Sequence, residues 1–141
     1  MDQTLSMVFF FAAVLIFGGL LFAIIALTKK GPKQLDIEKY RCRWLEIEQQ
    51  LKPDNTGSFS LAVLNADKLL GQALLERHIS GTTMGERMKT LQTKWSNANA
   101  VWSAHKLRNQ IAHDTDVKVD YDSARRALAA FKQGLKDVGA I

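Results

Sequence analysis

The chain has 141 residues, with 19 Lys and Arg against 14 Asp and Glu, which gives a formal net charge of +5. The chain is therefore basic, but it lacks the long runs of one charge that are typical of nucleic-acid-binding tails. Its single cysteine, Cys42, excludes an intrachain disulfide and a cysteine-based zinc site. The length fits one compact domain and an N-terminal extension, because about 100 residues can bury an adequate core without metal or disulfides.

Residues 7–27, MVFFFAAVLIFGGLLFAIIAL, are uninterruptedly apolar. At 1.5 Å per residue, a helix of this length just spans a hydrocarbon layer of about 30 Å. A cleavable signal peptide needs a positive N-terminal region, a shorter apolar segment and a small-residue cleavage site, whereas this segment follows MDQTLS and precedes TKKGPK. The pattern predicts an uncleaved transmembrane anchor over residues 1–28, with the lipid bilayer as its partner.

The charges on either side of the anchor predict its orientation. Lys29, Lys30 and Lys33 follow it, whereas only Asp2 precedes it. The positive-inside rule then places the N-terminus outside the cell membrane and the rest of the chain in the cytoplasm, a reducing compartment that suits a lone cysteine. The six basic residues between positions 29 and 43 either attract anionic headgroups as well or set the topology alone.

Residues 29–56 are predicted to form a basic juxtamembrane helix and linker. Gly31-Pro32 should end the membrane helix, and KPDNTGS should end the next one. One face of that helix is apolar. Its residues are Leu35, Tyr40, Trp44, Ile47 and Leu51.

Residues 57–141 are predicted to form an antiparallel helical bundle. Ser58 is the expected N-cap of a helix with apolar residues at i, i+3, i+4 and i+7. Thr83 and Glu86 form a capping box for a short helix, residues 98–114 read as a central helix, and a last helix begins after Asp120 and stops at Gly139. Together with the helix within residues 29–56, this makes about five helices with short connections and no convincing strand, which indicates an all-α fold.

The central helix carries HKLRNQIAHD, residues 105–114, where a core face is expected. On a helical wheel Arg108 points from the middle of the apolar arc, and His105 and Asn109 share one side of it. A buried unpaired guanidinium is prohibitively costly. Arg108 therefore pairs with an acid such as Asp67 or Glu76, or binds an anion in a cleft at a dimer seam, or belongs to an active site.

The active-site interpretation uses His113, which follows Arg108 by five residues and lies about 140° away on the wheel. The two side chains then flank a groove that can take a phosphate, since Arg grips phosphate with two bonds and His moves protons near pH 7. The three histidines are not spaced for zinc and have no nearby cysteine, so no metal is expected. The sequence has no G-x-G-x-x-G motif and no P-loop, so no cofactor is expected.

The motif RNQIAH, residues 108–113, resembles the signature of the HEPN family, and LAVLNADKLL, GERMKTL and SARRALAAFKQGL extend the similarity to small single-span bacterial membrane proteins with a HEPN-like part. The resemblance implies a homodimeric bundle whose motif helices meet across the dimer. Many members of that family are metal-independent ribonucleases, and others are scaffolds. In the catalytic case Arg108 holds the scissile phosphate, His113 is the acid or base, and Asn109 and His105 support them.

Two functions follow for the cytoplasmic module. One is RNA binding or metal-independent RNA cleavage at Arg108 and His113. The other is a non-catalytic dimerisation and interaction scaffold, which fits the modest charge of the domain slightly better. Tryptophans are the remaining candidates for RNA contact, as base-stacking platforms, but core packing is their more usual role. They are Trp44, Trp95 and Trp102.

Overall fold

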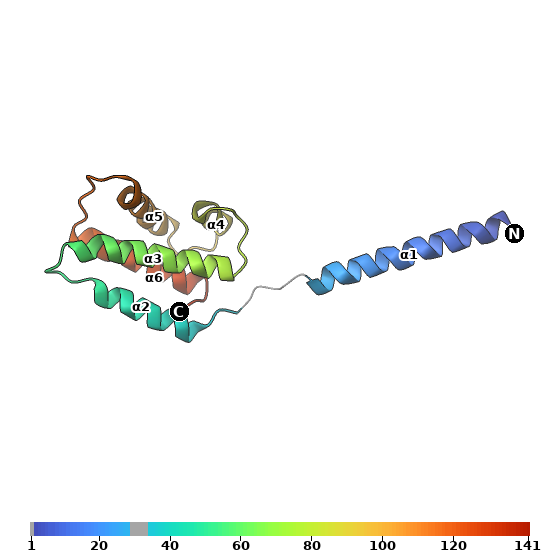
Figure 1. Ribbon diagram of the computed structural model, residues 1–141, viewed down its shortest axis with the longest axis horizontal. Helices are drawn as coiled ribbons and strands as arrows, with labels where there is room; N and C mark the ends of the chain where they lie inside the picture. Colours follow the sequence, from blue (N-terminus) through green and yellow to red (C-terminus); the bar gives the residue numbers. More distant parts are fainter. Residues whose placement is uncertain (1, 29–33) are drawn as a thin grey trace. The chain divides into compact units, whose positions relative to one another are not determined.

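The computed structural model describes residues 2–28 and 34–141. It divides into two compact units, Met1–Pro32 and Lys33–Ile141, each of which is described by itself. All regular structure in the described residues is helical (Figure 1). The predicted all-α class is therefore confirmed.

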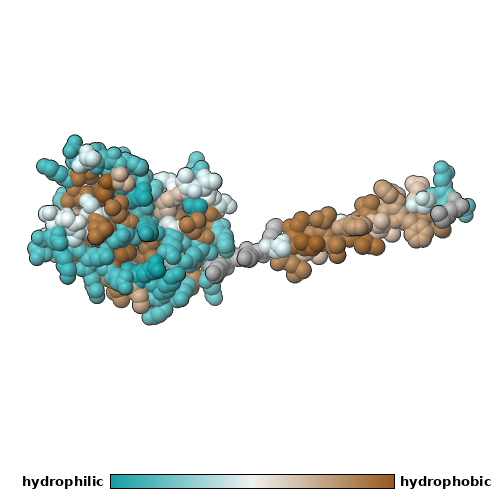
Figure 2. All heavy atoms as spheres, in the orientation of Figure 1, coloured by the Kyte–Doolittle hydropathy of each residue, from teal (hydrophilic) through white to brown (hydrophobic). Residues whose placement is uncertain are grey.

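The first unit is the helix α1, Gln3–Thr28, which is long and apolar enough to cross a membrane. None of its residues is buried, and Figure 2 shows its apolar side chains along most of its length. The helix begins four residues before the apolar segment predicted from position 7 and ends one residue after it. The flanking lysines at 29, 30 and 33, and the break expected at Gly31-Pro32, lie outside the described residues.

The second unit holds five helices joined by short connections, as the sequence predicts. They are α2 (Ile37–Gln50), α3 (Gly57–Glu76), α4 (Met84–Thr90), α5 (Ala98–His113) and α6 (Tyr121–Asp137). Their starts follow local capping chemistry, in which a side-chain oxygen accepts from a free backbone N–H. Asp36, Asn97 and Asp120 cap α2, α5 and α6 in this way. Thr83 and Glu86 form the predicted capping box of α4.

Consecutive long helices run antiparallel, which the contacts between their ends show. Lys39 meets Glu76, and Asn65 donates to Gln50, so α2 and α3 are antiparallel. The α5–α6 pair is also antiparallel, because Asp137 accepts from Ser96 at the start of α5 while Ser123 and Leu107 line one groove. The four long helices therefore run up, down, up and down, as in simple bundles.

The pair α3 and α6 runs parallel through the middle of the bundle. The rings of Phe59 and Tyr121 lie 5.7 Å apart at one end, and Arg77 approaches Gly139 at the other. Between these contacts α6 carries Gly134, where an added Cβ would meet Leu70 at 3.2 Å. The missing side chain lets α6 approach the other core helices closely. Phe131 and Leu135 of α6 are fully buried beside this crossing.

Two details of the bundle differ from the sequence-based expectations. First, α3 begins at Gly57 after Thr56, and Ser58 does not cap it. The Ser58 hydroxyl instead donates to Asn55 O and accepts from Lys52 N, so it closes the preceding turn. Second, α2 is part of the compact unit, since its Tyr40, Trp44 and Ile47 are buried in the common core.

Candidate functional site

The candidate site is built around Asp67, a buried acid in the middle of α3. The apolar periodicity of α3 turns this position toward α5, where the side chain is only 5% exposed. A carboxylate at such depth needs partners for both oxygens. Oδ1 lies 2.7 Å from His105 Nδ1, and Oδ2 lies 3.2 Å from Arg108 Nε.

Asn109 closes these contacts into a ring. Its Oδ1 accepts from Arg108 Nη1 at 3.0 Å, and its Nδ2 lies 3.3 Å from His105 Nε2. Since an amide nitrogen only donates, Nε2 must accept, and the proton of a neutral His105 sits on Nδ1 and points at Asp67. We call Asp67, His105, Arg108 and Asn109 the polar cluster. In this cluster one carboxylate faces one guanidinium.

Two of the three guanidinium nitrogens of Arg108 have partners in the cluster, Nε at Asp67 and Nη1 at Asn109, whereas Nη2 has no hydrogen-bond partner among the described residues. The Nε–Asp67 contact is an ion pair that does not have hydrogen-bond geometry. The Arg108 side chain remains 36% exposed. Of the two acids that the sequence suggests as partners of Arg108, Asp67 contacts it. Glu76 does not, and its Oε1 lies 3.5 Å from Lys39 Nζ.

His113 stays apart from the polar cluster. It is the exposed last residue of α5 and, in the part of the chain that the structure describes, no side-chain hydrogen bond or ion pair involves it. The connector that follows is acidic, with three exposed aspartates against Lys118. They are Asp114, Asp116 and Asp120. This charge opposes the approach of a phosphate to His113.

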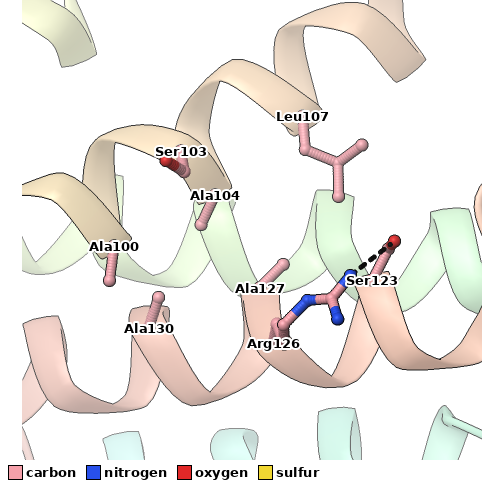
Figure 3. A pocket seen from close by; sticks show the side chains of 8 residues that line it. All are labelled: Ala100, Ser103, Ala104, Leu107, Ser123, Arg126, Ala127 and Ala130. Atoms are coloured by element: carbon pink, nitrogen blue, oxygen red, sulfur yellow. Dashed lines mark hydrogen bonds between the residues drawn. The ribbon is translucent and has the colours of Figure 1, made fainter.

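A groove of about 310 Å³ runs along the other side of α5, between α5 and α6 (Figure 3). Alanines form much of its lining, and Ser103 and Leu107 come from α5. Arg126 lies at its α6 side, where it donates to Ser123. The groove thus offers an apolar surface with one guanidinium and no group that titrates near neutral pH.

Sequence reasoning missed a second polar group, at the α2–α3 contact. The Tyr40 ring is buried beside Glu76. Burial is the main cause that raises the pKa of Tyr40, and the negative charge of Glu76 raises it further. Burial alone would raise the pKa of Glu76, but hydrogen bonding by Gln72 and the charge of Lys39 hold it below its usual value. Antiparallel pairing of α2 with α3 was the missing information, because it places Tyr40 opposite Glu76.

The tryptophans serve packing more than they serve binding. Trp44 and Trp95 are buried in the core, and Trp95 Nε1 donates to Met88 O. Trp102 is half-buried, donates to Gln92 and meets the His105 ring edge-on at 6.2 Å between centroids. Two of the three rings are thus closed to a nucleic-acid base.

The described residues contain no group of three His, Cys, Asp or Glu side chains placed to hold a metal ion. Chemically, the polar cluster can bind an anion at the exposed edge of Arg108 or stabilise the contact between α3 and α5. Comparisons with models of protein families, with curated proteins and with solved structures found no significant match for this chain.

Proposed function

We propose that this protein is a membrane-anchored interaction scaffold. In this proposal α1 crosses the cell membrane with its N-terminus outside, and the helical bundle is a cytoplasmic HEPN-like module that forms homodimers. The length and apolar surface of α1 support the anchor, and the lysines that follow it in the sequence support the orientation. The polar cluster then has a structural role, joining α3 to α5.

The contact of Asp67 with both His105 and Arg108 is the observation that carries this proposal. A general base or a phosphate clamp works best when its charge is directed at the substrate. Here the buried carboxylate offsets the charge of Arg108, and Nε2 of His105, the nitrogen that a general base would use, already lies against Asn109 Nδ2. The aspartates that follow His113 weaken phosphate binding further.

The groove between α5 and α6 is the surface that we assign to the dimer contact. The family resemblance implies that the motif helices meet across a dimer, and this groove flanks α5. Alanines along it let a second helix approach closely. We expect Ser103→Arg, which puts a long cation beside Arg126, to weaken dimerisation, whereas Ser80→Arg in an exposed loop should not.

RNA cleavage is the second candidate function. It is favoured by the RNQIAH motif and by the 36% exposure of Arg108, which leaves one edge of the guanidinium open to a phosphate. In this case a dimer partner must complete the site, since one copy does not bring His113 to the polar cluster.

One set of measurements separates the two functions. Residues 33–141 are examined by sedimentation equilibrium and by RNA cleavage without metal, as wild type and as His113→Asn. The control is His78→Asn, because His78 is an exposed histidine outside the motif and Asn tolerates its positive φ of 56°.

We expect a dimer, no cleavage, and no effect of either substitution on the dimer. Cleavage that His113→Asn abolishes and His78→Asn keeps contradicts the scaffold and establishes the enzyme. A monomer at ~100 µM, far above a micromolar dissociation constant, contradicts the dimer whichever activity is found.

A further inference from the structure

The bundle has two halves of different charge. We define the entry half as residues 34–43, 72–102 and 134–141, which include the start of α2, the end of α3, α4, the start of α5 and the end of α6. The far half is residues 44–71 and 103–133. The entry half carries eight basic and five acidic residues, whereas the far half carries eight of each. All net positive charge of the described bundle therefore belongs to the half that contains its N-terminal residues, which follow α1 in the sequence.

The acids of the entry half are largely engaged within the protein. Glu76 lies against Lys39, Glu86 accepts from Thr82 and Thr83, and Asp137 accepts from Ser96. Several basic side chains are exposed and form no ion pair with residues that the structure describes. They are Arg41, Lys89, Lys94 and Lys136. These cations give the entry half a positive surface.

The described bundle exposes four large aliphatic side chains, of which two lie in the entry half and two, Leu45 and Leu61, lie in the far half. Ile37, the first residue of α2, is 47% exposed, and Leu75, near the end of α3, is 54% exposed. They belong to the same end of the bundle, because Lys39 and Glu76 join these two helices there. Exposed aliphatic residues among cations are the combination that binds anionic lipid surfaces, through apolar insertion and electrostatic attraction.

The chain itself limits how far this half can be from the membrane. Eight residues separate Thr28 of α1 from Ile37 of α2, and a fully extended chain of that length spans roughly 30 Å. If α1 is anchored, as we propose above, the entry half is thus held at a high local concentration of lipid headgroups.

We propose that the entry half docks on the anionic lipid surface of the membrane that anchors the chain, with Ile37 and Leu75 entering the headgroup layer and the neighbouring cations binding lipid phosphates and carboxylates. The C-terminal end of α5, with Arg108 and His113, belongs to the far half. It therefore faces the cytoplasm when the bundle is docked. This proposal rests on the proposed anchor and orientation but not on dimerisation.

The first test uses residues 33–141, which fold without α1 because every buried core residue from Leu35 to Ala140 lies within them. The fragment is sedimented with vesicles of phosphatidylcholine alone or with a quarter of phosphatidylserine, at low and high salt. We expect binding to the anionic vesicles only, and its loss at high salt.

Matched variants locate the contact. Leu75→Ser is compared with Leu61→Ser, since both leucines lie on α3 and are 54% and 50% exposed. Arg41→Glu with Lys136→Glu is compared with Lys106→Glu with Lys118→Glu, which changes the net charge equally in the far half. We expect about fivefold weaker binding for Leu75→Ser and at least about tenfold for the first charge pair. The proposal is overturned if the far-half variants lose as much binding.

The second test uses the full chain in vesicles. Cys42 is exposed, is the only cysteine and lies in the entry half, so one fluorophore attaches there without substitution. Energy transfer to a headgroup acceptor should rise when anionic lipid is included. A fluorophore on Thr115→Cys, in a Cys42→Ser background, should change much less. Equal transfer in both lipid mixtures overturns docking, whereas failure of the chain to float with either vesicle overturns the anchor instead.

Discussion

At the scale of single residues, the polar cluster shows how one buried carboxylate determines the roles of its neighbours. Asp67 takes a hydrogen bond from His105 and faces Arg108. With these partners it fixes the His105 tautomer and the direction of the guanidinium. Removing a partner from a buried charged network costs more than the network itself contributes, because the remaining group stays desolvated.

We therefore expect Asp67→Asn to destabilise the bundle by about 2–4 kcal/mol. The amide cannot offset the charge of Arg108, and it offers one oxygen where the carboxylate offers two. Urea unfolding of residues 33–141, followed by circular dichroism, measures the loss. Asp54→Asn, at an exposed position, should remain within about 0.5 kcal/mol of wild type. Equal stability of the two variants would show that the cluster is not structural.

Asp137 gives a prediction for pH. Burial alone raises its pKa, but hydrogen bonds from the Ser96 hydroxyl and backbone N–H and from Gln133 outweigh burial and lower it. A carboxyl whose pKa is lower in the folded state stabilises the fold above its unfolded pKa of about 3.9, and this contribution is lost as pH falls through the folded value. We expect Asp137→Asn to cost about 1–2 kcal/mol at pH 6, and the difference from wild type to shrink toward pH 3. A difference that is constant with pH contradicts this assignment.

At the scale of the helices, Gly134 determines how closely α6 packs against the core. A Cβ there would lie 3.2 Å from Leu70 and 3.4 Å from Val101, two fully buried side chains of α3 and α5. At Gly71 the nearest atom is the Met84 sulfur at 3.3 Å, and a methionine moves easily. The two glycines therefore differ in what surrounds them.

Gly134→Val should destabilise the bundle by about 1–3 kcal/mol more than Gly71→Val. The cost of a β-branched residue within a helix is common to both variants, so their difference reports packing against Leu70 and Val101. Thermal unfolding of the two proteins under one condition measures it. A difference below about 0.5 kcal/mol would mean that the core helices can separate without cost.

The sequence predicts the helices well because their signals are local. Apolar periodicity and the caps at Thr83 and Asp120 need only neighbouring residues, and the structure confirms them. The start of α3 was misplaced because a serine before an apolar run has two uses. Ser58 can cap a helix or close a turn, and only the path of residues 52–57 decides that it closes a turn.

The site could be predicted only in part. A helical wheel shows that Arg108 needs a partner, and it suggests Asp67 or Glu76, but the choice depends on which turn of α3 lies opposite. The Asp67–His105 bond could not be found from α5 alone, because it joins residues 38 positions apart. Whether Arg108 and His113 act on RNA stays a prediction.

At the scale of the whole molecule, α1 and the bundle should be independent in stability. No residue of α1 is buried, and the core lies entirely in the other unit. We expect removal of residues 1–32 to leave the urea midpoint of the bundle unchanged when both proteins are measured in the same mild detergent. Near-ultraviolet circular dichroism of the three tryptophans, all of which belong to the bundle, reports its packing. Loss of that signal in the fragment would show that α1 supports the fold.

The central pairing of α3 with α6 has a consequence for synthesis of the chain. Phe59 and Tyr121 meet across about 60 residues of sequence, so the apolar face of α3 lacks its main partner until α6 leaves the ribosome. At 5–20 residues per second this takes roughly 3–12 s. Throughout that interval the α2–α3 hairpin exposes Leu70 and Leu74, which are fully buried later. Slower elongation lengthens this exposure, so aggregation of the nascent chain should depend on translation rate more than on the stability of the finished bundle.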